Sequence, residues 1–435
     1  NDSSFFEKEL TVQEVVLPAL KMKLEFDRKA FGAGDEVSVK IKVETNENEP
    51  LSSYKIKYAA QIDGEKILEE TAMTDFTGQK TIKFKLPGKL KTNDGLLNIM
   101  IDYQGQTESI SRSIPIVLNK IIFTLFPEGG DLVRGVESKV AFRALNEFGK
   151  PADVEGIVLN SKGKQVLNFE SFHNGIGAFE ITPALGEKYF AKITKPEGIS
   201  EQYELPQPLD RGYVLSAESN NQNELLLNIS TTENEELSLV GQVRGKICYA
   251  TAINAKAGQN QILIPTGVFP IGVAQFTLFD SKEIERAERL VFVNKNQQLN
   301  ISVTTDKEKY LPREKVNMTI TVKDERGMFL PANLSLSVVN DQLLSFADDK
   351  QCNILAKMLL EYDIKDKIEE PNFYFDAKEP KSEKALDYLL MTSGWRRFTW
   401  EKIMADELPA ITYIAEKAIV SGVVMDAYTA KHIAN

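Results

Sequence analysis

Cysteine and histidine are both scarce in this chain. Its 435 residues include two cysteines, Cys248 and Cys352, and two histidines, His173 and His432. Two cysteines are too few for a disulfide-stapled scaffold or a zinc ribbon, so we expect two buried free thiols, with one Cys248–Cys352 bridge as the open alternative. Two histidines offer little to a histidine-based metal site or a Ser-His-Asp triad. His173 lies in a turn-like segment and is predicted to be a surface residue.

The sequence also lacks the motifs that carry catalysis or cofactor binding. It has no GxGxxG, P-loop, HExxH, GxSxG or CxxC. The acidic clusters at 44–49 and 233–236 lack the spacing of a calcium loop, and we interpret them as solvated loops. A glycoside hydrolase would need a carboxylate pair in a cleft, and no spacing singles one out. We therefore predict no enzyme activity, no catalytic residue, no cofactor and no metal site.

Positive charge and long apolar runs are limited too. Lys and Arg number 52 against 63 Asp and Glu, and the net charge of −11 disfavours binding to nucleic acid or to anionic lipid. The uncharged run 260–279 reaches the length of a membrane span. Pro265, Gly267, Pro270 and Gly272 divide it, so the sequence predicts two short strands and no transmembrane span.

What the chain does contain is a repeated strand-turn-strand pattern. Residues 23–43 and 301–322 each have an alternating apolar stretch, Asp with Arg or Lys, an aromatic residue, a turn and a second alternating stretch. Residues 74–87 and 172–183 share another pattern, a glycine turn before an alternating strand that ends at proline. Alternation with a period of two predicts strands, and short strands separated by turn residues predict antiparallel sandwiches.

The length suggests about three or four domains, and the fold class is predicted to be all-β, with tandem antiparallel β-sandwiches. The predicted divisions are a leader strand at 1–20, sandwiches at 21–118, 119–207, 208–298 and 299–410, and the start of a further β domain at 411–435.

Residues 350–403 differ from the rest, because their apolar residues recur at helical spacing. Leu386, Leu389 and Leu390 line one side of a predicted helix, and Ser382 is its predicted N-cap. The sequence therefore predicts a helical insert in the fourth sandwich.

Both tryptophans of the chain lie at the end of this insert. Trp395 and Trp400 flank Arg396 and Arg397. Trp and Arg are favoured where interfaces gain most of their binding energy, so these four residues are predicted to contact a partner. Alternatively, the tryptophans pack the insert onto the fourth sandwich and the arginines pair with local acids.

Several segments together resemble a known family. The Asp-aromatic-turn pattern is similar to the opening of macroglobulin-type domains. FTLFPEGGDLVRG, FPIGVAQFTLFD, LDYLLMTSGWRRFTW and IVSGVVMDAY, in this order, resemble α-macroglobulin-like exported proteins of Bacteroidetes. Those proteins continue into carboxypeptidase-regulatory-like domains and, in some, TonB-receptor plug domains. The resemblance covers nearly the whole chain. It implies macroglobulin-like sandwiches, a truncated carboxypeptidase-regulatory-like domain at 411–435, and a location in the periplasm or at the outer membrane or cell surface.

One departure from that superfamily bears on function. Protease-trapping α-macroglobulins carry a Cys-Gly-Glu-Gln thioester, whereas Cys248 lies in KICYAT and Cys352 in KQCNIL. The resemblance without the thioester implies a non-enzymatic scaffold or binding protein of the bacterial envelope, engaging a protein or polymer partner. The alternative is the N-terminal accessory region of a TonB-dependent outer-membrane uptake system. The oligomeric state stays open.

Overall fold

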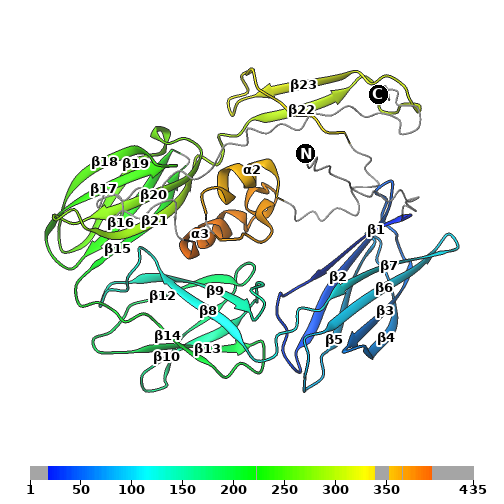
Figure 1. Cartoon of the computed structure of the whole chain (residues 1–435), viewed down its shortest axis with the longest axis horizontal. Helices are drawn as coiled ribbons and strands as arrows, with labels where there is room; N and C mark the ends of the chain where they lie inside the picture. The colour runs from blue at the N-terminus through cyan, green and yellow to red at the C-terminus, as the bar shows by residue number, and fades with distance from the viewer. Residues whose placement is uncertain (1–17, 222, 339–351, 365, 394–435) are drawn as a thin grey trace, which may run out of the picture. The chain divides into compact units, whose positions relative to one another are not determined.

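The computed structural model describes residues 18–221, 223–338, 352–364 and 366–393. Almost all regular structure within them is antiparallel β-sheet, which confirms the predicted fold class of tandem antiparallel sandwiches (Figure 1). Where each domain begins and ends stays a prediction. None of the helices in these ranges is long and apolar enough to cross a membrane.

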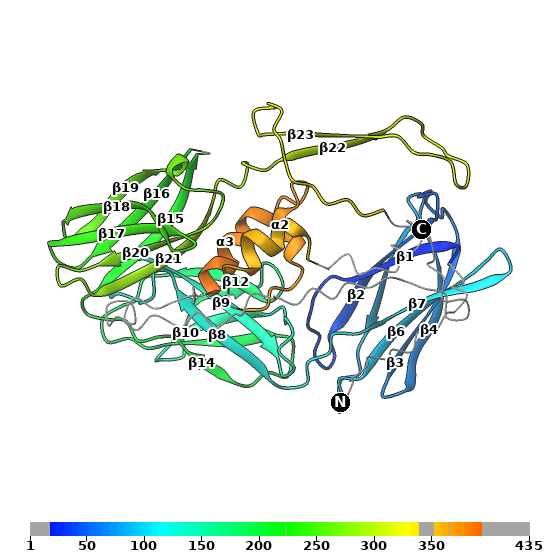
Figure 2. The ribbon, with the colours of Figure 1, turned by 45° about the horizontal axis from the view of Figure 1, so that its top comes forward.

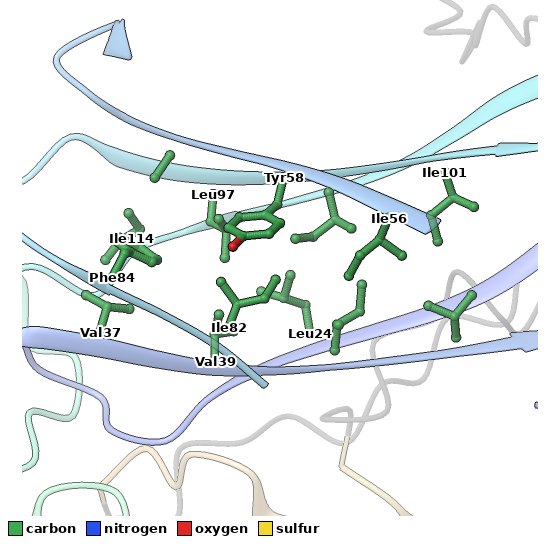
Figure 3. Close-up of a cluster of buried hydrophobic side chains, with 14 of the residues drawn as sticks. Leu24, Val37, Val39, Ile56, Tyr58, Ile82, Phe84, Leu97, Ile101 and Ile114 are labelled. Carbon is green, nitrogen blue, oxygen red and sulfur yellow. The ribbon is translucent and has the colours of Figure 1, made fainter. Parts of the chain in front are cut away.

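The first sandwich joins a three-stranded sheet, β1-β2-β5, to a four-stranded sheet, β4-β3-β6-β7. Alternation places Val37, Val39, Ile41 and Val43 of β2 on the inner face, where all four are fully buried. They meet the inner side chains of the other sheet, as Figure 3 shows for part of this core. The strands are β1 Leu20–Phe26, β2 Glu36–Thr45, β3 Lys55–Ile62, β4 Glu65–Met73, β5 Gln79–Lys85, β6 Gly95–Tyr103 and β7 Gln106–Ser113.

The second sandwich joins β12-β9-β8 to β11-β10-β13-β14. Its core holds four phenylalanines, Phe123, Phe142, Phe169 and Phe179, and the centroids of neighbouring rings lie 5.1 to 6.4 Å apart. The strands are β8 Ile121–Pro127, β9 Ser138–Asn146, β10 Glu155–Asn160, β11 Gln165–Glu170, β12 Ile176–Ile181, β13 Tyr189–Lys195 and β14 Gln202–Glu204.

The third sandwich joins β15-β16-β19 to β18-β17-β20-β21. The uncharged run 260–279 falls in β19, the short helix η1 and β20, so the prediction of two strands is confirmed. The elements are β15 Tyr213–Asn221, β16 Glu224–Thr231, β17 Glu235–Val243, β18 Lys246–Ala255, β19 Gly258–Pro265, η1 Thr266–Val268, β20 Gly272–Phe279 and β21 Glu285–Val293.

The returning sequence pattern forms a two-stranded hairpin of β22 (Asn300–Thr305) and β23 (Met318–Lys323), as predicted. Residues 331–338, after Gly327, alternate between apolar and polar side chains in the manner of a strand, but they form none. Past a single bridge between Lys323 and Phe329, no described strand pairs with this stretch, and alternation without a neighbour gives no ladder.

The helical insert consists of α2 (Ile354–Ala356), the π-helical turn η2 (Lys357–Glu361), the 3-10 turn η3 (Pro371–Phe375) and α3 (Ser382–Thr392). Leu386, Leu389 and Leu390 are buried along α3, as their spacing predicts. Ser382 is not the N-cap, because Ala385 N–H already donates to the carbonyl of Lys381 and the Ser382 side chain is buried.

The insert does not pack on the β22–β23 hairpin in the described part of the chain. Instead, α3 lies against β8, β9 and β12 of the second sandwich and against β21 of the third, while η2 contacts β20 (Figure 1 and Figure 2). The contacts of the insert therefore join elements that lie far apart in the sequence.

Candidate functional site

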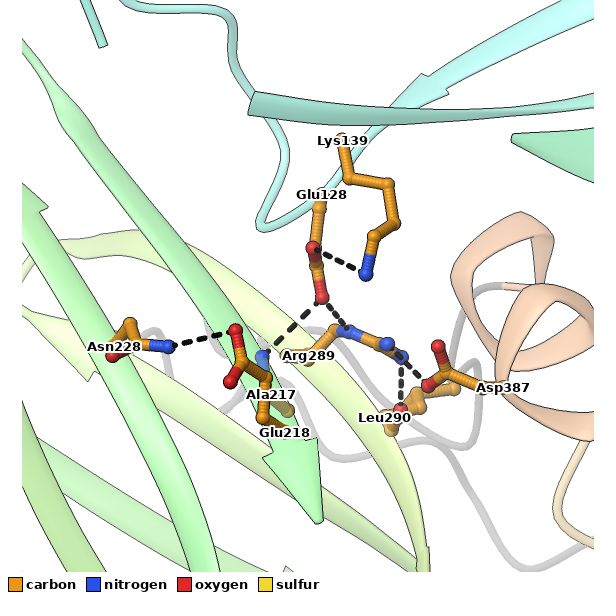
Figure 4. Close-up of polar contacts among 8 residues, drawn as sticks. All are labelled: Glu128, Lys139, Ala217, Glu218, Asn228, Arg289, Leu290 and Asp387. Atoms are coloured by element: carbon orange, nitrogen blue, oxygen red, sulfur yellow. Dashed lines mark hydrogen bonds and ion pairs between the residues drawn. The ribbon is translucent and has the colours of Figure 1, made fainter. Parts of the chain in front are cut away.

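The side chain of Arg289 on β21 is only 2% exposed, and it lies where three parts of the chain meet. Its Nε donates to Glu128 Oε1 at 2.8 Å, Nη1 donates to the Leu290 carbonyl at 2.6 Å, and Nη2 donates to Asp387 Oδ1 at 2.5 Å (Figure 4). Glu128 follows β8 and Asp387 lies on α3. One guanidinium therefore links the second sandwich, the third sandwich and the insert.

The charges around Arg289 are balanced. Glu128 Oε1 also accepts the Ala217 N–H at 3.3 Å, and Lys139 Nζ lies 4.0 Å from Glu128 Oε2. Burial by itself disfavours the charge on Arg289, but the carboxylates of Asp387 and Glu128 overcome this and raise the pKa of Arg289. A buried charge is tolerated when it is paired and hydrogen-bonded in this way, and losing one partner is costly.

Gly129 allows Glu128 to reach Arg289. Its φ is +86°, and a Cβ added there would lie 2.7 Å from the backbone nitrogen of Leu215. The Gly129 carbonyl accepts the Glu288 N–H at 3.1 Å, so this segment attaches to the edge of β21. The Glu-Gly-Gly sequence forms a turn, which is closed by a hydrogen bond from Gly130 N–H to the Pro127 carbonyl. Its second role, as a contact between sandwiches, was not predicted.

The insert binds the sandwiches through ion pairs of a single polarity. In each of these pairs the acid belongs to the insert and the base to one of the three sandwiches, so their charges are complementary. The exposed pairs contribute about 0.2–1 kcal/mol each, while the pairs of Arg289 and of the buried Asp363 are separate cases. The pairs are Asp363–Arg244 at 3.5 Å, Asp366–Arg143 at 2.9 Å, Glu369–Lys150 at 3.5 Å, Glu370–Lys29 at 3.1 Å and Asp387–Arg289 at 2.5 Å.

An apolar cluster lies between these ion pairs. Phe172 meets Tyr388 edge to face at 5.6 Å, and Phe292 meets Phe375 in the same way at 5.6 Å. Burying each large apolar side chain contributes about 1.5–3 kcal/mol, so this cluster provides most of the docking energy. Its buried members are Ile176, Val273 and Leu290 from the sandwiches and Leu360, Ile364, Ile368, Tyr374, Ala385, Leu386, Leu389 and Leu390 from the insert.

His173 also lies under the insert. Its ring stacks on Phe373 with centroids 3.6 Å apart, and Asn174 beside it donates to Glu370 at 3.4 Å. Burial lowers the pKa of His173, although the nearby Glu370 and Asp153 carboxylates oppose the shift. The prediction of a surface histidine is wrong for this ring, because a turn almost 200 residues further along the chain covers it.

A groove of about 460 Å³ lies beside α3 on the second sandwich. Glu155 and Glu170 face each other across β10 and β11 in its wall. Both oxygens of Glu155 accept hydrogen bonds from Lys195 Nζ, at 3.0 and 2.8 Å. Glu155 is therefore held in an ion pair within the second sandwich.

The other predicted site residues divide into two sets. Trp395, Arg396, Arg397 and Trp400 lie outside the described residues, as does His432, so the partner contact stays a prediction. Cys248 and Cys352 are separate free thiols, each half-buried, so the bridge is excluded and the predicted full burial is wrong. Within the described ranges, no group of three or more His, Cys, Asp or Glu is placed to hold a metal ion.

Sequence could have revealed little of the Arg289 site. Arg289 lies in an alternating strand, where an inward-facing arginine is unusual, and this was the one available signal. Neither acid partner could be identified, because Glu128 and Asp387 lie 161 and 98 residues away.

No family model matches the chain, and no curated protein matches it. Among solved structures, the native form of E. coli α2-macroglobulin matches at 10% identity and a TM-score of 0.33, over 71% of this chain and 26% of that one. Latent PorU from Porphyromonas gingivalis matches at 11% and 0.26, over 63% and 34%. The E. coli adhesin FdeC matches at 12% and 0.21, over 65% and 99%.

This chain spans about a quarter of the length of the α2-macroglobulin it matches. At TM-scores this low, the likenesses carry no argument about the family or the activity of the chain.

Proposed function

We propose that this chain is a non-enzymatic, extracytoplasmic scaffold of the bacterial envelope that binds a protein or polymer partner. The observation that carries the proposal is the use made of the buried charge of Arg289. Arg289 contacts Glu128 of the second sandwich, Asp387 of the insert and the carbonyl of Leu290 in its own strand, and it does not line the groove beside α3. Chemistry that an enzyme would direct at a substrate is used here to hold domains together.

A scaffold gains from such fixed junctions. Surfaces on different sandwiches bind one partner more tightly when their spacing is set beforehand. If the sandwiches had to be ordered during binding, the entropy cost would reduce the affinity. The ion pairs and the apolar cluster of the insert provide this pre-organisation for the second and third sandwiches.

We propose that Trp395, Arg396, Arg397 and Trp400 contact the partner. Residues of these types account for most of the binding energy in many interfaces. Trp395→Ala and Trp400→Ala are each expected to lower the affinity for a partner captured from the envelope by at least about tenfold. Phe76→Ala is the matched control, because Phe76 is 82% exposed and lies in the first sandwich.

The location is tested separately from the contact. The full-length protein is expected in the envelope fraction of its native cells and to be captured with a specific partner after mild cross-linking. A protein found in the cytosolic fraction would overturn the proposal, and so would a purified chain that hydrolyses envelope glycans. Equal capture by the tryptophan variants and wild type would refute the contact residues alone.

A further inference from the structure

The strand β18 has an open edge. It is the longest edge strand in the described part of the chain, with 10 residues, and it pairs on one side only, with β17. Its sequence, KICYATAINA, has one charged residue, Lys246 at the first position, and no glycine or proline. A long, uncharged edge strand is a template for pairing with another strand.

Three other edge strands of this protein are protected by charge or by short length. β4, with 9 residues, carries Glu65, Lys66, Glu69 and Glu70, while β5 carries three lysines and β14 has only 3 residues. Charged side chains and short length are the usual devices that keep sheet edges apart. The absence of both from β18 sets it apart from these edges of the same chain.

The side chains of β18 also indicate a missing neighbour. Thr251 and Ile253 face the core opposite Leu239 and Leu237, which are buried to 0% and 1% exposure, yet both remain half-exposed. Tyr249, opposite Gly241, is half-exposed as well. These core-facing side chains are only partly covered, so pairing with one more strand would bury more of their apolar surface.

We propose that β18 pairs with β18 of a second copy of this chain. The pairing is antiparallel, around a two-fold axis perpendicular to the sheet that passes between the two copies of Thr251. Such an axis keeps the core-facing side of both copies on the same side of the joined sheet, so one residue of the strand must lie directly opposite its own copy. The two four-stranded sheets then form one continuous sheet.

This register follows from the side chains that it brings together. It places Tyr249 opposite Ile253 of the second copy, in both directions, and Thr251 opposite Thr251. Aromatic residues opposite β-branched ones, and threonine pairs, are favourable across antiparallel strands. Moving the axis to residue 250 or 252 separates Tyr249 from Ile253, so Thr251 is the preferred centre.

The lysines near the ends of β18 predict how the affinity of the pairing depends on salt. The same register brings Lys246 of one copy towards Lys256 of the other at each end of the joined strands. These like charges repel weakly at low ionic strength and are screened by salt. The dimer is therefore expected to become tighter as salt is added, whereas a dimer held by opposite charges would weaken.

The test is the mass of the full chain in solution, measured by sedimentation equilibrium from micromolar to millimolar concentration. The wild type is expected to rise from 48.8 kDa towards twice that mass. Thr251→Lys and Thr251→Glu each place like charges across the axis and should raise the dissociation constant at least about tenfold. An equal mixture of the two variants should restore a dimer, since Lys then faces Glu.

Ser109→Lys on the edge strand β7 is the matched control and should dimerise as the wild type does. The mixing result also guards against misfolding, because two unfolded variants could not restore each other. A wild type that stays at 48.8 kDa throughout would overturn the proposal. So would a Thr251→Lys variant that dimerises like the wild type, because the contact would then lie elsewhere.

Discussion

Arg289 and Glu128 lie 161 residues apart in the chain and form an ion pair of 2.8 Å in which each side chain is 2% exposed. An ion pair buried this deeply contributes little net stability compared with an apolar contact of the same shape. It instead favours one arrangement of the two sandwiches, because neither charge can be left in the interior without the other.

Replacing Arg289 with methionine is expected to lower the free energy of unfolding by about 3–5 kcal/mol, because the buried Glu128 then loses its closest countercharge and keeps only Lys139, 4.0 Å away. Adding Glu128→Gln to that variant should recover part of the loss. Chemical denaturation measures both effects. The control is Arg112→Met on the exposed edge of β7, expected within about 0.5 kcal/mol of wild type. Equal losses at the two positions would contradict the role given to Arg289.

Gly129 and Gly130 allow a test in adjacent positions. Both have positive φ, +86° and +122°, but only an added Cβ at Gly129 would overlap a neighbour, the backbone of Leu215. Gly129→Ala is therefore expected to lower the melting temperature well beyond Gly130→Ala, whose cost is the backbone strain alone, about 1–3 kcal/mol. Calorimetry of the two variants checks this, and equal melting temperatures would show that the contact with Leu215 is unimportant.

The acids of the insert can be neutralised without changing their shape. Asp366→Asn, Glu369→Gln and Glu370→Gln together should speed amide exchange in α3 by about tenfold, since three exposed pairs contribute about 0.2–1 kcal/mol each. Added salt should have the same effect on wild type and little effect on the triple variant. Glu204→Gln, which breaks a pair within the second sandwich, is the control.

The docking of the insert should also depend on pH through His173. Burial lowers the pKa of His173 from its usual value of 6.5, so the folded state favours the neutral ring. The stability that this provides is present above pH 6.5 and is lost as the pH falls towards the lowered pKa. Exchange in η3 and α3 should therefore accelerate below about pH 6.5 in wild type and much less in His173→Phe. The facing Glu370 and Asp153 oppose the shift and reduce its size. An identical acid response in the two proteins would exclude His173.

Sequence patterns predicted the local structure well. The inner face of β2 and the buried side of α3 were both readable, because periods of two and of 3.6 residues reflect which side chains point inward. The pattern did not reveal what each element packs against. His173 was expected at the surface, and its cover, Phe373, lies in a turn with no periodic signal. The stretch 331–338 has the alternation of a strand, but pairing depends on a neighbour that alternation cannot supply.

The candidate site was even less accessible from sequence. Tryptophan and arginine types indicated 395–400, which lies outside the described residues. The junction that the structure shows depends on Glu128, Arg289 and Asp387, three ordinary charged residues in a chain in which a quarter of the residues are charged. Only their convergence in space makes them unusual.

The position of Glu128 also determines how this protein can be divided for experiments. A fragment holding only the third sandwich would expose Arg289 without its two acids and leave Leu290 and Phe292 uncovered. The same reasoning limits the grafting of a third sandwich into a related protein. The recipient must supply an acid in the position of Glu128, in the preceding sandwich, and another in the position of Asp387, on the helix that follows. No single sandwich is therefore a portable unit, because the second sandwich, the third sandwich and the insert have to stay together.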